Sequence, residues 1–83
     1  MGRNLYIQKG AEEMTIYRIE KSGKTYFKDG LRKYLNRYMP RMKTIVFYND
    51  KKGIKYRGVM MWYGYYIQRW DNRSNKWVNV NEF

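Results

Sequence analysis

Residues 29–43 (DGLRKYLNRYMPRMK) constrain the fold most, because they carry the clearest helical periodicity in the chain. Their apolar residues recur at i, i+3, i+4 and i+7, which places them on one stripe of an α-helix. Asp29 is expected as the N-cap, and Pro40 is expected to end the helix, since proline disfavours an α conformation at Met39. We therefore predict one helix over residues 29–39 with an apolar underside covered by strands. The stripe consists of Leu31, Tyr34, Leu35 and Tyr38.

The other side of this helix is basic, and positive charge continues along the whole chain. Eighteen Lys and Arg against seven Asp and Glu give a formal charge of +11 over 83 residues. Charge this dense opposes compaction unless a polyanion neutralises it, and nucleic acid is the first candidate. An acidic protein surface is the second candidate partner and an anionic membrane is the third. The alternative without any partner is a helix face that is simply solvated. The cations expected to contact phosphates are Lys28, Arg32, Lys33, Arg37, Arg41 and Lys43.

The composition argues against most catalytic chemistry. The chain contains no histidine and no cysteine, which removes the commonest general base, the thiol nucleophile and nearly all zinc sites. Its acids are scattered without the spacing of a carboxylate pair, so we expect no enzyme, metal or cofactor. The longest apolar run, residues 59–67, is about half the length of a membrane-spanning helix. With no hydrophobic signal segment at the N-terminus, a cytoplasmic protein without membrane contact is expected.

Strands are predicted before the helix. Residues 1–10 contain a short apolar alternation that suits an edge strand, and residues 14–21 are rich in β-formers. A turn at Ser-Gly leads into residues 25–27. A two-residue loop would set Lys21 opposite Lys24, so a longer loop or a bulge is an equal alternative.

Residues 44–48 are β-branched and aromatic, and they are expected to pair with a strand that begins at Ile54. A loop of residues 49–53 would set Tyr48 opposite Ile54. This register predicts a core-facing set of Val46, Tyr48, Ile54 and Tyr56, and an outer set of Ile45, Phe47, Lys55 and Arg57.

A second hairpin is expected near the C-terminus, with Trp70 opposite Trp77. This register puts Tyr65, Ile67, Val78 and Val80 on one apolar face, and a one-residue slip would mix apolar with polar residues. The other face then carries Tyr66, Gln68, Trp70, Trp77, Asn79 and Asn81. Between the two hairpins Gly58 and Gly64 mark a bend or tight reversal, and Tyr56, Trp62 and Tyr63 are assigned mainly to the core.

Sixteen aromatic residues are more than a small core can hide, so some rings should lie among the cations. Rings beside Asn and Gln suit stacking of unpaired bases. The alternatives are a Trp pair that only stabilises its hairpin, a ring face packed under the helix, and loop lysines that only aid solubility. The expected stacking residues are Tyr66, Trp70 and Trp77, and the expected accessory cations are Lys51, Lys52, Lys55, Arg57, Arg69, Arg73 and Lys76.

These patterns predict an α+β fold: one domain over residues 1–83, with a twisted antiparallel sheet of five to seven short strands and one helix across it. The expected order is β-β-β-α-β-β-β-β. The predicted function is non-enzymatic nucleic-acid binding, with RNA favoured over duplex DNA because rings on a sheet suit splayed single-stranded bases.

Two other functions are compatible with the sequence. The first is a small inhibitor of a host nuclease, toxin or other defence protein, acting directly or through shared RNA. This hypothesis rests on the small size of the chain and on its composition, which is rich in Lys, Asn, Tyr and Ile, as is typical of AT-rich phage genes. The second rests on a resemblance: the chain is similar in size, charge and terminal antiparallel sheet to RelE-type endoribonucleases, but lacks their N-terminal helix pair. This resemblance implies metal-independent RNA cleavage by Arg, Lys and Tyr.

Overall fold

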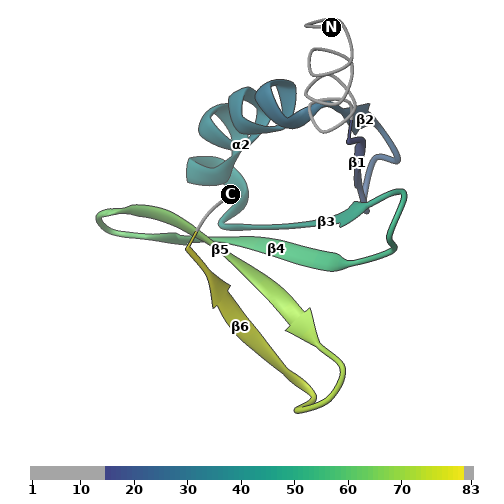
Figure 1. The fold of residues 1–83 in the computed structure, drawn as a ribbon. Helices are drawn as coiled ribbons and strands as arrows, with labels where there is room; N and C mark the ends of the chain where they lie inside the picture. The colour runs from purple at the N-terminus through teal and green to yellow at the C-terminus, as the bar shows by residue number, and fades with distance from the viewer. Residues whose placement is uncertain (1–14, 82–83) are drawn as a thin grey trace, which may run out of the picture.

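The structure is a computed structural model that describes residues 15–81. Within these residues one helix packs on an open antiparallel sheet of six strands, in the order β2-β1-β3-β4-β5-β6 (Figure 1). The predicted α+β fold is therefore confirmed, while the strand predicted in residues 1–10 lies outside the described residues. The elements are β1 (Tyr17–Ile19), β2 (Thr25–Tyr26), α2 (Lys28–Met42), β3 (Thr44–Asn49), β4 (Lys55–Met61), β5 (Gly64–Asp71) and β6 (Lys76–Val80).

Helix α2 is longer at both ends than residues 29–39. Its N-cap is Phe27, whose carbonyl accepts from the Leu31 amide at 2.8 Å, and no side chain caps the helix. The predicted N-cap at Asp29 is wrong. Its carboxylate lies instead in the first turn, where negative charge interacts favourably with the positive end of the helix dipole.

Pro40 lies inside α2 and does not end it. Proline removes one backbone hydrogen bond, but Met39 beside it is fully buried and anchors the last turn to the sheet. The helix ends one turn later at Lys43, whose amide donates to the Met39 carbonyl at 2.8 Å. Burial of an apolar side chain thus outweighs the local preference of proline.

The core forms where α2 packs on the sheet, chiefly against β2, β3 and β4. Leu31, Leu35 and Met39 are buried at i, i+4 and i+8 on one stripe of the helix. Gly58 in β4 allows the closest approach, since a Cβ there would stand 3.0 Å from the Met39 sulfur. The rest of the buried apolar cluster comes from the sheet: Tyr17, Ile19, Ile45, Phe47 and Ile67.

The β3–β4 register differs from the predicted one by one residue. Tyr48 pairs with Lys55 rather than Ile54, so the turn contains residues 50–53. Buried Asn49 belongs to the strand and closes this turn: its side-chain oxygen accepts from the amides of Lys51 (3.1 Å) and Lys52 (2.9 Å). Gly53 completes the turn at a φ of 70°, which favours glycine.

A slip of one residue moves every side chain to the other face. Ile45 and Phe47 are therefore core residues and Val46 and Tyr48 lie on the outer face, so the predicted core and outer sets of these β3 residues are wrong. Tyr56 is half-buried against the core, as predicted, and its ring stacks on Phe47 at 5.4 Å. Arg57 lies on the outer face, also as predicted.

Some predictions for the other hairpins are confirmed and one is wrong. Trp70 pairs with Trp77 as predicted, and β1–β2 uses the longer of the two loops considered, with Arg18 opposite Thr25. The β4–β5 reversal is a tight turn at Trp62 and Tyr63, which are 92% and 64% exposed. Their assignment to the core is wrong, because a turn projects them beyond the sheet.

Stability should fall as the pH rises above about 10. Burial, and secondarily the neighbouring Tyr56, raises the pKa of Tyr17 above its ordinary value of 10.0. Burial also raises the pKa of Tyr56, against a lowering influence of Arg69. Because both pKa values are higher in the folded state, each hydroxyl ionises at a lower pH in the unfolded chain. Rising pH through this range therefore lowers the free energy of unfolding. Denaturant unfolding at a series of alkaline pH values measures the loss. In Y17F/Y56F part of this decline should disappear, and an identical pH dependence in the two proteins would contradict the assignment.

Candidate nucleic-acid interface

One face of the β4–β6 region turns away from the helix. Ile67 of β5 points into the core under α2. Because successive side chains of a strand alternate, Tyr66, Gln68 and Trp70 lie on the opposite face. Figure 1 shows that the β5–β6 hairpin also extends beyond the span of α2. We call this outer surface the tryptophan face: Lys55, Arg57, Tyr66, Gln68, Trp70, Trp77 and Asn79.

Two indoles and a guanidinium form the centre of the tryptophan face. The Trp70 and Trp77 rings meet edge to face, with centroids 5.3 Å apart and planes at 71°. The Arg57 guanidinium carbon lies 4.3 Å from the Trp77 ring centroid, and the Lys55 amine lies 6.0 Å from it. This is cation–π geometry. The positive charges of Arg57 and Lys55 therefore lie over a half-buried aromatic ring.

A row of polar side chains fixes the orientation of Arg57. Its Nε–H donates to the Gln68 side-chain oxygen at 2.8 Å, and the Gln68 amide nitrogen donates to the Asn79 side-chain oxygen at 3.0 Å. These contacts cross three neighbouring strands. They use only one of the guanidinium donors, which leaves the terminal N–H groups suited to a phosphate.

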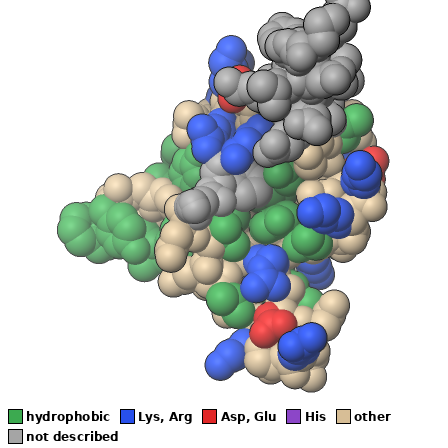
Figure 2. Space-filling view, in the orientation of Figure 1, with side chains coloured by type: hydrophobic (Ala, Val, Ile, Leu, Met, Phe, Trp, Pro, Cys, Tyr) green, Lys and Arg blue, Asp and Glu red, His purple; other side chains and the backbone are tan. Residues whose placement is uncertain are grey.

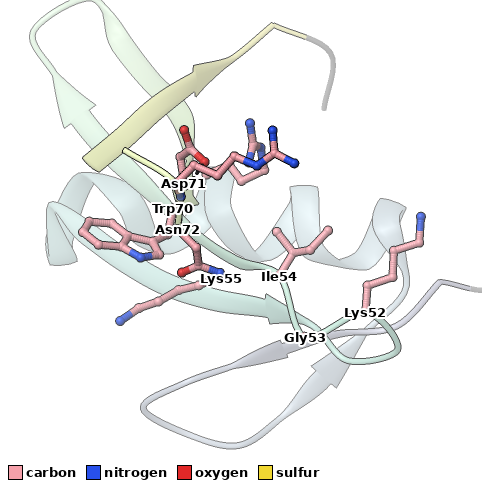
Figure 3. A pocket seen from close by; sticks show the side chains of 9 residues that line it. Lys52, Gly53, Ile54, Lys55, Trp70, Asp71 and Asn72 are labelled. Carbon is pink, nitrogen blue, oxygen red and sulfur yellow. Dashed lines mark hydrogen bonds between the residues drawn. The ribbon is translucent and has the colours of Figure 1, made fainter. Parts of the chain in front are cut away.

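A cationic hollow of about 470 Å³ adjoins the tryptophan face at the end of the sheet. It lies between the β3–β4 and β5–β6 turns, which become neighbours because β4 pairs with β5. In Figure 3 the Trp70 indole, the Asn72 amide and the Lys55 side chain lie together on one side, and Lys52 lies toward the other. We call this hollow the loop pocket. Its charged lining residues are Lys52, Lys55, Arg69, Arg73 and Asp71.

The one acid of the loop pocket is engaged in its own turn. Asp71 accepts from the Ser74 hydroxyl at 2.7 Å and from the Arg73 amide at 3.2 Å. The Ser74 hydrogen bond is the main cause that lowers the Asp71 pKa, so the group stays ionised and holds the β5–β6 turn. Four cations then face one structural carboxylate, and the hollow suits an anion.

Charge on the outer face is uneven. On the β1–β3 side, Arg18 forms an ion pair with Asp50 (3.3 Å) and lies over the Tyr48 ring at 4.9 Å. The Tyr48 hydroxyl donates to Glu20 at 2.6 Å, which raises the Tyr48 pKa. Acids therefore balance this side locally. The excess charge of the outer face lies over β4–β6, where the tryptophans are.

The structure does not bring the helix cations to the tryptophans. Lys28, Arg32, Lys33, Arg37 and Arg41 are exposed on α2, and Lys43 follows its last turn. The helix covers the face of the sheet opposite Trp70 and Trp77. Figure 2 accordingly shows Lys and Arg side chains both on the side of α2 and around the β5–β6 hairpin. The residues expected to grip one ligand thus form two separate surfaces.

The remaining expected cations cluster around the sheet end. Lys51 is exposed in the β3–β4 turn next to Lys52, and Lys76 is exposed at the start of β6, paired with Asp71. Lys52 and Arg73 are brought together across the loop pocket despite their separation in sequence. This grouping follows from strand pairing, so no local sequence pattern indicates it.

Several residues of these surfaces were missing from the expected site. Gln68 and Asn79 were placed on the correct face by alternation, but their role in fixing Arg57 depends on the β4–β5 register. Tyr34 and Tyr38 were assigned to the core stripe of the helix. They pack against the core but stay half-buried at the edge of that stripe, beside the fully buried Leu31, Leu35 and Met39.

Among residues 15–81, no group of His, Cys, Asp and Glu is arranged to hold a metal ion. In the same part of the chain no helix is both long and apolar enough to cross a bilayer. No family model, curated protein or solved structure matches the chain.

Proposed function

We propose that the chain is a non-enzymatic cytoplasmic protein that binds single-stranded nucleic acid, with RNA preferred, on the tryptophan face. The observation that supports this most is the Arg57 guanidinium 4.3 Å above Trp77, beside Trp70 and next to the cationic loop pocket. Bases stack on the indoles, and phosphates contact Arg57 and the pocket cations.

The open sheet favours a single strand over a duplex. Stacking requires unpaired bases, and a flat face of half-buried rings has no projecting helix that would enter a major groove. The Asn79 side-chain oxygen accepts from Gln68, and the amide nitrogen of this exposed residue adds a donor beside the rings, suited to a base edge or to a 2′-hydroxyl. This second contact is the reason for the proposed preference for RNA over single-stranded DNA.

Binding should depend steeply on salt. If Arg57 and the pocket cations neutralise about four phosphates, the slope of log K against log salt should be about −3. Affinity for a labelled single-stranded RNA should then fall about 50-fold between about 50 and 200 mM salt. Fluorescence anisotropy measures this, with single-stranded DNA and duplex DNA of the same sequence as weaker ligands. Undetectable RNA binding at the lower salt concentration would refute the proposed function.

A pair of charge-matched variants separates the loop pocket from general charge. K52Q/R73Q removes two pocket cations and should flatten the salt slope by about 1.4. K21Q/K24Q removes the same charge from the exposed β1–β2 loop, away from the tryptophan face, and should leave the slope nearly unchanged. Equal slopes in both variants would show that the pocket has no special role.

The defence-protein inhibitor and the metal-independent endoribonuclease stay predictions from the sequence. Neither is favoured by a particular contact among the described residues, whereas the cation–aromatic surface has a direct chemical match in single-stranded RNA. We therefore put forward RNA binding alone.

A further inference from the structure

A second surface on the opposite side of the molecule repeats the chemistry of the tryptophan face. Tyr26 of β2 and Tyr34 and Tyr38 of α2 form a continuous row, with ring centroids 5.2 Å apart for Tyr26–Tyr34 and 4.7 Å for Tyr34–Tyr38. With Lys33 and Arg37 they line an open hollow of about 360 Å³. We call this surface the tyrosine face.

The cations of the tyrosine face lie beside the rings. The Arg37 guanidinium carbon lies 5.6 Å from the Tyr38 ring centroid, the same pairing that Arg57 makes with Trp77. Lys33 and Arg37 are exposed, and neither forms an ion pair with any residue of the part of the chain that the structure describes. The tyrosine face therefore offers rings together with unneutralised charge.

The tyrosine hydroxyls add hydrogen-bond donors. Burial raises the pKa of Tyr34, and the neighbouring Tyr26 and Tyr38 raise it further. The Tyr34 hydroxyl is therefore protonated at neutral pH and can donate to a phosphate oxygen. Rings, cations and hydroxyl donors on one shallow hollow match a nucleotide unit, as on the tryptophan face.

The two faces cannot contact the same few nucleotides. Tyr34 and Tyr38 belong to α2, which packs on β2, β3 and β4. Trp70 and Trp77 lie on the far side of the sheet, so the sheet separates the two surfaces. A short single strand reaches one face or the other.

We propose that the tyrosine face is a second nucleic-acid site, so that one molecule holds two single-stranded segments at once and bridges them. The inference builds on the proposed function of the tryptophan face. A formal charge of +11 between two polyanions lowers their mutual repulsion. Counterions released at each face favour occupation of both. The expected consequence is strand bridging, an activity that a single binding face does not provide.

The test uses two non-complementary RNA oligonucleotides of about six nucleotides, short enough to occupy one face each. One carries a donor fluorophore and the other an acceptor. With the full chain at low salt, energy transfer should appear, and native mass spectrometry should show two strands on one protein. The variant K33Q/R37Q should lose energy transfer and bind one strand, with its remaining affinity within about twofold of the wild type. W77A should likewise bind a single strand, through the tyrosine face.

K21Q/K24Q is the matched control, since it removes equal charge outside both faces, and it should keep the energy transfer. A wild-type complex that saturates at one strand would overturn the inference while leaving the proposed function intact. Equal loss in K33Q/R37Q and K21Q/K24Q would also overturn it, because general charge would then explain bridging, and so would a bridged complex containing two protein chains. Absence of any RNA binding by the wild type would instead refute the proposed function.

Discussion

Replacement of Trp77 by alanine is expected to weaken binding of single-stranded RNA at the tryptophan face by about 5- to 150-fold, the effect of one lost base stack. Trp77 contributes more than its own surface, because Arg57 lies on its ring and Trp70 meets its edge. The variant leaves Arg57 without the aromatic surface that positions it. Anisotropy titration at low salt measures the change, with thermal unfolding as a check that the variant is folded.

Trp62 provides the matched control. It is the same residue type and is 92% exposed at the β4–β5 turn, away from the tryptophan face. W62A should bind RNA within about twofold of the wild type, and W77F should recover much of the affinity lost in W77A, since a phenyl ring still stacks. An equal loss in W62A and W77A would show that stacking is not located at Trp77.

Replacement of Phe47 by alanine should lower the free energy of unfolding by about 3–5 kcal/mol. Phe47 is fully buried, stacks on Tyr56 at 5.4 Å and meets Tyr17 edge to face at 6.0 Å. A domain of this size has a total stability of only about 4–12 kcal/mol, so a sizeable part of the variant should be unfolded at 37 °C. Urea denaturation followed by tryptophan fluorescence gives the value.

Val46 tests the register behind this prediction. In the structure Val46 lies half-buried on the outer face beside Phe47, so V46A should cost about 1 kcal/mol or less. The register first expected from the sequence places Val46 in the core and Phe47 outside. That register predicts the reverse ranking. A larger loss in V46A than in F47A would therefore contradict the observed β3–β4 pairing.

Strong local periodicity made part of the fold predictable. Leu31 and Leu35 recur at helical spacing and are fully buried, so the helix and its buried side followed from the sequence. The pairing of Trp70 with Trp77 was also predictable, because only that register separates the apolar from the polar residues of β5 and β6. In both places the pattern repeats over several residues, so one ambiguous residue does not change the predicted structure.

Features that depend on a single residue were not predictable from the sequence. The β3–β4 register depends on Asn49, which resembles an ordinary loop residue in sequence but is buried and closes the turn with its side chain. Pro40 resembles a helix terminator, yet the burial of Met39 outweighs it. Trp62 resembles a core residue, but the tight turn exposes it. Each outcome depends on tertiary contacts that local preference does not contain.

By itself the sequence determined that the chain forms one amphipathic helix and an antiparallel sheet, with basic charge and aromatic rings in excess of what a small core needs. Only the tertiary structure decided where those features lie relative to one another. Alternation in a strand defines two faces but does not say which one the helix covers. That choice depends on the summed burial of Ile45, Phe47 and Ile67 against α2. It placed the helix cations and the paired tryptophans on opposite sides of the molecule.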